Sequence, residues 1–315
     1  MSIQFRILAG AALVAAALAQ EPKQPQKKGQ PQRNNPSVIQ IMDTKDMSTR
    51  VLYRSSFVFE APNWSPDGKY LLLNSRNKLW KLPVEGGEPA AVDTGSAARL
   101  NNDHGISPDG KWFAISGGNV FILPSSGGEP KPITNAIPSY YHTWAPDGKS
   151  VIMCAQRNNN FDLYRVPVDG GDEVRLTVSP GYDDGPDYSP DGKWIYFNSD
   201  RSGSWDIWRI PPAGGGPDDK NAEQITKDDF EDWFPHISPD GKKMVLISFE
   251  KGTQGHPANQ SVMLRMMPVT KGKPDVSKIK VIARLFGGQG TMNVNSWSPD
   301  SRYFAFVSYE KAPEH

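Results

Sequence analysis

The hydrophobic residues of the chain are grouped in short runs, with no long helical stripe. Clear examples lie at 70–73, 112–115 and 194–197, and an alternating stretch such as 79–83 follows each of them. Runs of four to eight apolar residues bounded by Gly, Pro, Asn, Asp and Ser are typical of β-strands. The pattern therefore predicts many short strands joined by tight turns.

A turn of the form Ser-Pro-Asp-Gly-Lys precedes each of these apolar runs. Pro fixes φ at the second position, Asp hydrogen-bonds locally, and Gly accepts the positive φ that begins the next strand. The prolines lie 42, 38, 44, 49 and 60 residues apart, a spacing typical of a repeat architecture. The six turns start at Ser65, Ser107, Ala145, Ser189, Ser238 and Ser298, and the last has Ser301 in place of Gly.

Each repeat supplies four strands, because the third strand leads through a Gly-Gly turn such as 127–128 to a fourth. Four strands repeated six times predict an all-β, six-bladed propeller. The sixth repeat has only two strands before His315, whereas two strand-like segments, 38–43 and 49–53, precede the first repeat. We expect these N-terminal strands to complete the last blade and close the ring, which removes exposed sheet edges.

The first 36 residues differ in composition from the rest. Arg6 and the apolar run 7–19 predict a secretory signal peptide over 1–19, with an uncleaved anchor as the alternative. A basic linker rich in Pro and Gln follows over 20–36, and the propeller occupies 37–315 with 30 basic and 34 acidic residues. This slight acidity argues against nucleic-acid binding. We expect a periplasmic or secreted monomer with no transmembrane span after cleavage.

The repeats resemble those of TolB-type propellers. The resemblance rests on the Trp-Ser-Pro-Asp-Gly-Lys turn at 64–69, the run Asn-Ser-Asp-Arg-Ser-Gly-Ser-Trp-Asp-Ile-Trp at 198–208, and the Gly-Gly turns. It covers about residues 37–310 and implies the propeller fold. From it we expect a binding or scaffold module of the cell envelope. Its partner would be an envelope protein, a peptide or an anionic carbohydrate.

The unusual polar residues collect on one predicted face of the propeller. The Ser-Pro-Asp-Gly and Gly-Gly turns share one face, here called the turn face, so the remaining loops lie on the opposite, variable face. Four of the five histidines fall on the variable face although they lie up to 152 residues apart. These are His104, His142, His236 and His256, and the other groups expected to bind a ligand there are Asp103, Arg157, Asp184, Arg201, Asp232 and Gln289.

Histidine is a common metal ligand, so the four histidines predict a site for a divalent metal such as Mn, Zn or Ca. The alternative is that they cap strands or bond to backbone groups, and the two arginines also belong to the repeat itself. The layout of His236, Glu250, His256 and strand 262–266 loosely resembles that of oligogalacturonate lyases. This resemblance implies a metal-assisted elimination on uronate oligosaccharides, with His142 or His104 as the base.

Overall fold

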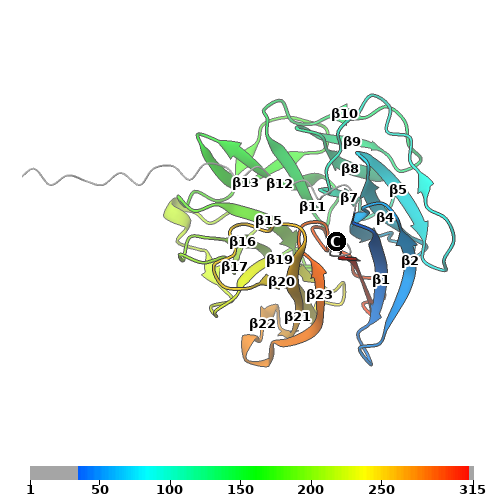
Figure 1. Cartoon of the computed structure of the whole chain (residues 1–315). Helices are drawn as coiled ribbons and strands as arrows, with labels where there is room; N and C mark the ends of the chain where they lie inside the picture. The colour runs from blue at the N-terminus through cyan, green and yellow to red at the C-terminus, as the bar shows by residue number, and fades with distance from the viewer. Residues whose placement is uncertain (1–34, 312–315) are drawn as a thin grey trace, which may run out of the picture.

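The computed structural model describes residues 35–311, so the predicted signal peptide and nearly all of the predicted linker lie outside the described residues. Within this range the chain forms strands β1 to β24 and two short 3-10 helices, η1 (Pro217–Asp219) and η2 (Val276–Lys278). No helix of residues 35–311 has the length and apolar character needed to cross a membrane. Six sheets surround a common centre (Figure 1), which confirms the predicted six-bladed propeller.

Blades 1 to 4 are four-stranded antiparallel sheets whose strands follow the order of the chain. Blade 1 consists of β3 (Glu60–Trp64), β4 (Tyr70–Ser75), β5 (Lys78–Pro83) and β6 (Ala90–Ala91). Blade 2 consists of β7 (His104–Ile106), β8 (Trp112–Ser116), β9 (Val120–Pro124) and β10 (Lys131–Pro132). Blade 3 consists of β11 (Ser139–Trp144), β12 (Ser150–Arg157), β13 (Asn160–Pro167) and β14 (Val174–Arg175). Blade 4 consists of β15 (Asp183–Tyr188), β16 (Ile195–Ser199), β17 (Asp206–Ile210) and β18 (Glu223–Gln224). The first strands of neighbouring blades contact one another around the centre.

Blade 5 has one more strand than the pattern requires. It consists of β19 (Glu231–Ile237), β20 (Lys243–Phe249), β21 (Gln260–Thr270), β22 (Lys273–Pro274) and β23 (Lys280–Gly287). The long strand β21 pairs with the short β22 near its end and with β23 along most of its length. The inserted hairpin accounts for the wide spacing between the fifth and sixth turns.

Blade 6 closes the ring as the sequence predicts. It consists of β24 (Tyr303–Tyr309), β1 (Ser37–Asp43) and β2 (Thr49–Ser55), with β1 in the middle. The register between β1 and β24 is continuous from Ser37↔Tyr309 to Asp43↔Tyr303. Both ends of the folded chain therefore share one sheet, so that the ring cannot open without breaking this ladder. The inner segment of the blade, 291–298, is not a regular strand, but it pairs with β24 at Trp297↔Phe304. Its backbone hydrogen bonds with β24 run from Ala305 N to Ser296 O at 3.0 Å, from Val307 N to Thr291 O at 3.1 Å and from Ser298 N to Tyr303 O at 2.8 Å.

A β-bulge interrupts the innermost strand in blades 1, 3, 4 and 5. Side chains alternate between the two faces of a strand, so two residues three positions apart normally lie on opposite faces. When a bulge inserts one extra residue between them, both side chains lie on the same face. In blade 4 the bulge lies between Asp184 and Asp187, with Gly185 at φ +60°. A Cβ on Gly185 would lie 2.8 Å from Phe234 Cδ1, so the backbone approaches closely here. The bulges make room for two levels of polar side chains along the central axis.

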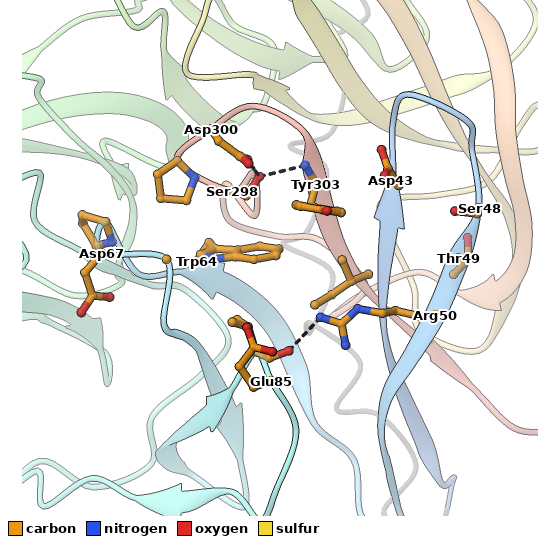
Figure 2. A pocket seen from close by; sticks show the side chains of 15 residues that line it. Asp43, Ser48, Thr49, Arg50, Trp64, Asp67, Glu85, Ser298, Asp300 and Tyr303 are labelled. Carbon is orange, nitrogen blue, oxygen red and sulfur yellow. Dashed lines mark hydrogen bonds between the residues drawn. The ribbon is translucent and has the colours of Figure 1, made fainter.

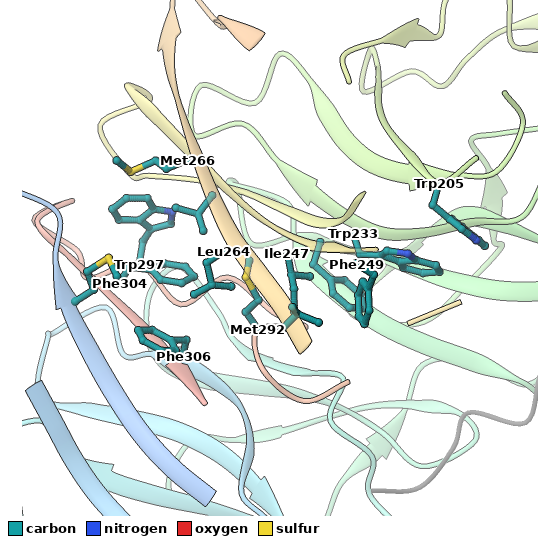
Figure 3. Close-up of a cluster of buried hydrophobic side chains, with 14 residues drawn as sticks. Trp205, Trp233, Ile247, Phe249, Leu264, Met266, Met292, Trp297, Phe304 and Phe306 are labelled. Atoms are coloured by element: carbon teal, nitrogen blue, oxygen red, sulfur yellow. The ribbon is translucent and has the colours of Figure 1, made fainter. Parts of the chain in front are cut away.

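Apolar side chains fill the space between the blades, and one large cluster spans blades 4, 5 and 6. It extends from Trp205 and Trp233 at one end to Trp297 and Phe304 at the other, with Leu264 between them (Figure 3). The Trp205 and Trp233 rings are 3.9 Å apart between centroids. Burying one such side chain contributes about 1.5–3 kcal/mol. This cluster fixes β19 and the aromatic residues that cover the polar groups of the variable face.

Candidate functional site

The structure brings together three of the predicted site residues on the variable face, His142, Asp184 and His256. His142 Nε2 lies 2.8 Å from Asp184 Oδ1, and His256 Nε2 lies 3.6 Å from Asp184 Oδ2. The Tyr182 hydroxyl donates to the same Oδ2 at 3.5 Å. Asp184 therefore lies between two imidazole rings that come from β11 and from the loop between β20 and β21.

Aromatic rings enclose this group, which we call the Asp184 cluster (His142, Asp184, His256). The His256 ring lies 4.3 Å from Trp233 and 5.1 Å from Phe234 between centroids, and the His142 ring is stacked on Phe234 at 6.3 Å. The His142 and Asp184 side chains are 1% and 0% exposed. In such surroundings an ion pair or hydrogen bond is strong, because little water competes for the charged atoms.

His236 belongs to a second level of polar contacts, closer to the turn face. Its Nδ1 is 3.1 Å from Asp187 Oδ2, and its Nε2 is 3.0 Å from Met292 O. Asp187 also accepts a hydrogen bond from the Thr143 hydroxyl at 2.9 Å and one from Asn295 Nδ2 at 2.8 Å. One carboxylate in blade 4 thus joins blades 3, 5 and 6 across the centre.

His104 lies apart from the other histidines. It is fully buried in β7, and its Nε2 lies 3.3 Å from Leu72 O of the preceding blade. Burial lowers the pKa of His104 to about 4, although the Leu72 carbonyl and the Asp103 charge oppose the shift. A neutral, fully enclosed imidazole is suited to joining blades 1 and 2. The four histidines therefore occupy three different places around the channel.

The remaining predicted ligand residues are also bonded within the propeller. Gln289 Nε2 donates to Asn102 Oδ1 at 3.0 Å, and the fully buried Asp103 accepts a hydrogen bond from Asn101. Arg157 forms a two-pronged ion pair with Glu173, at 2.8 and 2.9 Å. These contacts agree with the alternative that such groups hold neighbouring loops and blades together.

Two buried ion pairs involve the other predicted residues. Arg201 contacts Asp183 at 2.7 Å and Asp219 at 3.1 Å. Asp232 accepts hydrogen bonds from Arg265 and from the Ser248 hydroxyl, the latter at 2.6 Å. Burial raises the pKa of Asp183 and of Asp232 to about 6, although the neighbouring guanidinium groups oppose the shift. Sequence analysis did not predict that Asp183 would pair with Arg201, or Arg265 with Asp232.

The predicted metal site is not assembled in this arrangement. Among residues 35–311 no three His, Cys, Asp or Glu side chains are placed to share a metal ion. In the Asp184 cluster the two imidazoles approach opposite oxygens of one carboxylate, so their nitrogens do not point to a common position. The metal therefore stays a prediction, and no chemical step is derived from it.

Two hollows open on the turn face, each between neighbouring blades. The first has a volume of 720 Å³ and lies between blades 6 and 1, where the ring closes. The Trp64 and Tyr303 rings are stacked in it at 6.3 Å, and Figure 2 shows Asp67 to one side of them and Arg50 to the other. Arg50 Nη2 donates to Val84 O at 2.7 Å. The carboxylates that line this first hollow are Asp43, Asp67, Glu85 and Asp300.

The second hollow has a volume of 650 Å³ and lies between blades 2 and 3. Trp144 is nearly buried in its wall, whereas Trp112 is 45% exposed. Lys131 Nζ donates to Asp169 O at 3.1 Å, as Arg50 does to Val84 O in the first hollow. The lining carboxylates are Asp109, Asp147 and Asp169. The same kind of hollow, with aromatic walls and an acidic edge, thus occurs twice.

Comparison with known proteins places this architecture in a family. The profile of the TolB beta propeller domain matches residues 129–277. The uncharacterised protein Atu1656 of Agrobacterium fabrum is 46% identical over 280 residues, which cover 87% of this chain and 92% of that protein. The chain belongs to the TolB-type propeller family. The expected resemblance is thereby confirmed.

Solved structures agree with this assignment. A propeller from Agrobacterium tumefaciens, provisionally named as a TolB, is 45% identical and superposes with a TM-score of 0.82, covering 89% of this TolB-type propeller and all of that chain. TolB of Acinetobacter baumannii (19% identity, TM-score 0.61, 81% of this chain and 65% of that chain) shares the fold. An oligogalacturonate lyase from Vibrio parahaemolyticus (14% identity, TM-score 0.51, 86% and 78%) likewise shares the fold alone.

Sequence analysis did not predict the hollows of this TolB-type propeller, although a signal for them exists. The third strand of blades 1, 3 and 4 carries Lys81, Arg165 and Arg209 two residues before its terminal proline. Blades 2 and 6 carry Ile122 and Ile41 at the matching place, and the hollows lie beside those two residues. An isoleucine in a strand is typical of a core position, so the sequence alone does not distinguish Ile41 and Ile122 from other core residues.

Proposed function

We propose that this TolB-type propeller is a binding module of the cell envelope, periplasmic or secreted, that holds a partner protein on its turn face. The observation that supports this face is the pair of hollows between the blades, 720 and 650 Å³ in volume. Trp112 is 45% exposed there. Aromatic side chains at a concave, solvent-accessible surface are typical of protein interfaces.

The predicted rim residues are less suited to a first contact with a partner. The groups of the Asp184 cluster and the Asp187 contacts are buried and bonded to residues of other blades. Binding to them would require these bonds to break first. We therefore place the interface on the turn face, and we propose that the central groups hold the ring together.

Site-specific photo-crosslinking in the cell envelope tests this proposal. The photoreactive residue p-benzoylphenylalanine replaces Thr49 in one variant and Asp169 in another, since both are exposed and line the two hollows. Ile137, which is 68% exposed on the variable face, is the matched control. We expect a cross-linked partner from the first two positions and none from Ile137. A cross-link from Ile137 alone contradicts the turn-face interface, and none from any position contradicts a binding module.

We propose as a second candidate an enzyme that performs elimination on uronate oligosaccharides at the variable face. The observation that favours it is the His142–Asp184 pair, because a carboxylate that holds an imidazole can orient a general base. An ultraviolet assay for unsaturated uronate products and elemental analysis for Mn, Zn and Ca test it. Activity lost in a His142→Gln variant supports this candidate. A metal-free protein that is silent on uronate polymers contradicts it.

A further inference from the structure

The outermost strand of blade 5 is much longer than those of blades 1 to 4. The outermost strands β6, β10, β14 and β18 contain two residues each, whereas β23 contains eight. One side of β23 pairs with β21, from Gln260↔Gly287 to Met266↔Lys280. Within residues 35–311 no strand pairs with its other side. An edge of this length presents a row of backbone N–H and C=O groups to which a further strand can bond.

The inserted segment that contains β23 is strongly basic. Residues 270–287 include five cationic residues and one acidic residue, whereas the propeller as a whole has 30 basic and 34 acidic residues. Lys278 is paired with Asp275 at 2.8 Å. The other four cations are exposed and form no ion pair with a residue of the range 35–311; they are Lys271, Lys273, Lys280 and Arg284. The segment is therefore a cationic patch on an otherwise slightly acidic propeller.

Two of these cations flank the open edge of β23. In the ladder with β21, Lys280 lies opposite Met266 and Arg284 lies opposite Met263. The pairing of β21 with β20 is regular between these two methionines, which are three residues apart and so lie on opposite faces of the sheet. Lys280 and Arg284 therefore lie on opposite faces as well. Val281, which follows Lys280 along the strand, is 41% exposed.

The charge of this edge determines which kind of strand can pair with it. A second copy of β23, paired antiparallel and centred on Ile282, would place Lys280 opposite Arg284. Like charges directly opposite each other destabilise a pair of strands, whereas opposite charges stabilise it. Cationic side chains are one means by which natural sheets prevent self-pairing at an edge. They do not prevent the addition of an acidic strand.

We propose that an extended acidic segment of a partner protein pairs with β23 as an additional outer strand of blade 5. The backbone of β23 provides the hydrogen bonds, and Lys280 and Arg284 contact Asp or Glu side chains on the two faces of the added strand. None of the residues 280–287 lines either hollow of the turn face. This surface is therefore separate from the proposed turn-face interface and does not depend on it.

Fluorescence polarisation with three labelled, end-blocked nonapeptides tests the proposal. The first peptide repeats Glu-Asp-Val three times, which places carboxylates on both faces of an extended chain. The second has the same sequence but is N-methylated at every peptide bond, so it keeps the charge and cannot donate backbone hydrogen bonds. The third has Gln and Asn in place of Glu and Asp, so it can pair as a strand but has no charge.

Two double variants separate the edge from the overall charge. Lys280→Glu/Arg284→Glu reverses both edge cations, and the fold should tolerate it because both side chains are exposed. Lys78→Glu/Lys149→Glu makes the same change of net charge in blades 1 and 3, at exposed lysines that have no ion pair within the range 35–311. Circular dichroism and a thermal melt confirm that each variant is folded.

Amide hydrogen exchange locates the bound peptide. We expect exchange in residues 280–287 to slow when the first peptide is added and exchange in β2 to stay unchanged. Strand β2 is the matched control because it is the other long outer strand, and its arginines already have partners. Arg50 donates to Val84 O at 2.7 Å, and Arg54 is paired with Glu310 at 2.7 Å.

We expect the first peptide to bind the wild type and the Lys78/Lys149 variant within twofold of each other, and the Lys280/Arg284 variant at least tenfold more weakly. The N-methylated peptide and the uncharged peptide should each bind the wild type at least tenfold more weakly than the first.

Equal binding of the N-methylated peptide overturns strand pairing and assigns the patch to charge alone, as an anionic lipid surface would use it. Equal binding of the uncharged peptide overturns the role of the two cations. No binding of the first peptide, or binding that leaves exchange in 280–287 unchanged, overturns the site. A dimer in which residues 280–287 are protected without any peptide assigns the edge to a second copy instead. None of these outcomes alters the cross-links expected from Thr49 and Asp169, which test the turn face.

Discussion

Removal of the Asp187 carboxylate is the sharpest test of the central contacts. The change Asp187→Ala leaves the Thr143 hydroxyl, the Asn295 amide and the His236 ring without this acceptor, at a position that is 5% exposed. A buried donor left unsatisfied costs about 1–3 kcal/mol. Each of the three keeps a second contact: Thr143 to Trp144 O, Asn295 to Ile237 O and His236 to Met292 O. We therefore expect the free energy of unfolding to fall by about 3–5 kcal/mol, in the lower half of the range obtained by adding this cost for the three donors.

The change Asp187→Asn separates hydrogen bonding from shape. Its remaining oxygen can face Asn295 and His236, while its amide nitrogen can donate to Thr143, whose hydroxyl also accepts. We expect the free energy of unfolding of this variant to fall by only about 0.5–1.5 kcal/mol, because a neutral acceptor replaces a charged one and the hydrogen bonds remain. The two variants should thus differ by about 2–3 kcal/mol although they change the same residue.

Urea unfolding followed by tryptophan fluorescence measures both losses, and a thermal melt provides a second value. For a chain of this size each kcal/mol corresponds to about 2–4 °C, so Asp187→Ala should melt roughly 10 °C below the wild type. Asp191→Ala, at an exposed turn of the same blade, is the control and should change much less. Equal losses for the alanine and asparagine variants, or a loss below about 1 kcal/mol for alanine, would refute a role as the acceptor that joins four blades.

Three further predictions concern groups elsewhere in the ring. His104 has a pKa of about 4 when folded and about 6.5 when unfolded, so its stability contribution is present above pH 6.5 and is lost as the pH falls; at pH 5 the loss is about 2 kcal/mol. His104→Asn should remove that part of the pH dependence in urea unfolding, and an unchanged profile would contradict it. Arg201→Gln strands Asp183 and Asp219 and should cost about 3–5 kcal/mol in the same assay; a loss below 1 kcal/mol would argue against a buried ion pair. Ser301→Gly relieves φ +62° but loses the hydrogen bond from Asp240 N at 2.8 Å, so its melting temperature should stay within about 3 °C of the wild type, whereas Ser301→Ala should melt lower.

The fold could be predicted from the sequence because its signals are local and repeated. Each Ser-Pro-Asp-Gly turn fixes a reversal of the chain by its own backbone chemistry, and the structure confirms all six. Closure could be predicted as well, since two strands were missing at one end and two were left over at the other. The inserted hairpin of β22 and the strand β23 could not, because the segment 271–287 has no copy elsewhere in the chain with which to compare it.

The contact partners of His104 and His142 depend on β-bulges that the sequence does not show. His104 and His142 both lie four residues before a turn proline. The register of β7 is regular at His104, which is directed to Leu72 of the preceding blade. In β11 the register shifts between Tyr141 and Thr143, so His142 is directed to Asp184 of the following blade. Two histidines at the same distance from their turn prolines therefore contact neighbouring blades on opposite sides, because one strand contains an inserted residue and the other does not.

Ring closure explains why the polar groups of the centre are bonded internally while the turn face keeps open hollows. A closed ring brings five inner strands and the inner segment of blade 6 together, and their polar side chains lose contact with water, so they must bond to one another across the blades. Asp184 and Asp187 show this, since each contacts residues from other blades at two levels of the centre. Groups used in this way are poorly available to a partner. The gaps between blades on the turn face are different, because a single cation often spans them, as Arg50 does to Val84 O at 2.7 Å and Lys131 to Asp169 O at 3.1 Å. The two hollows stay open beside these bridges, so the groups that line them are more available to a partner than the buried groups of the centre.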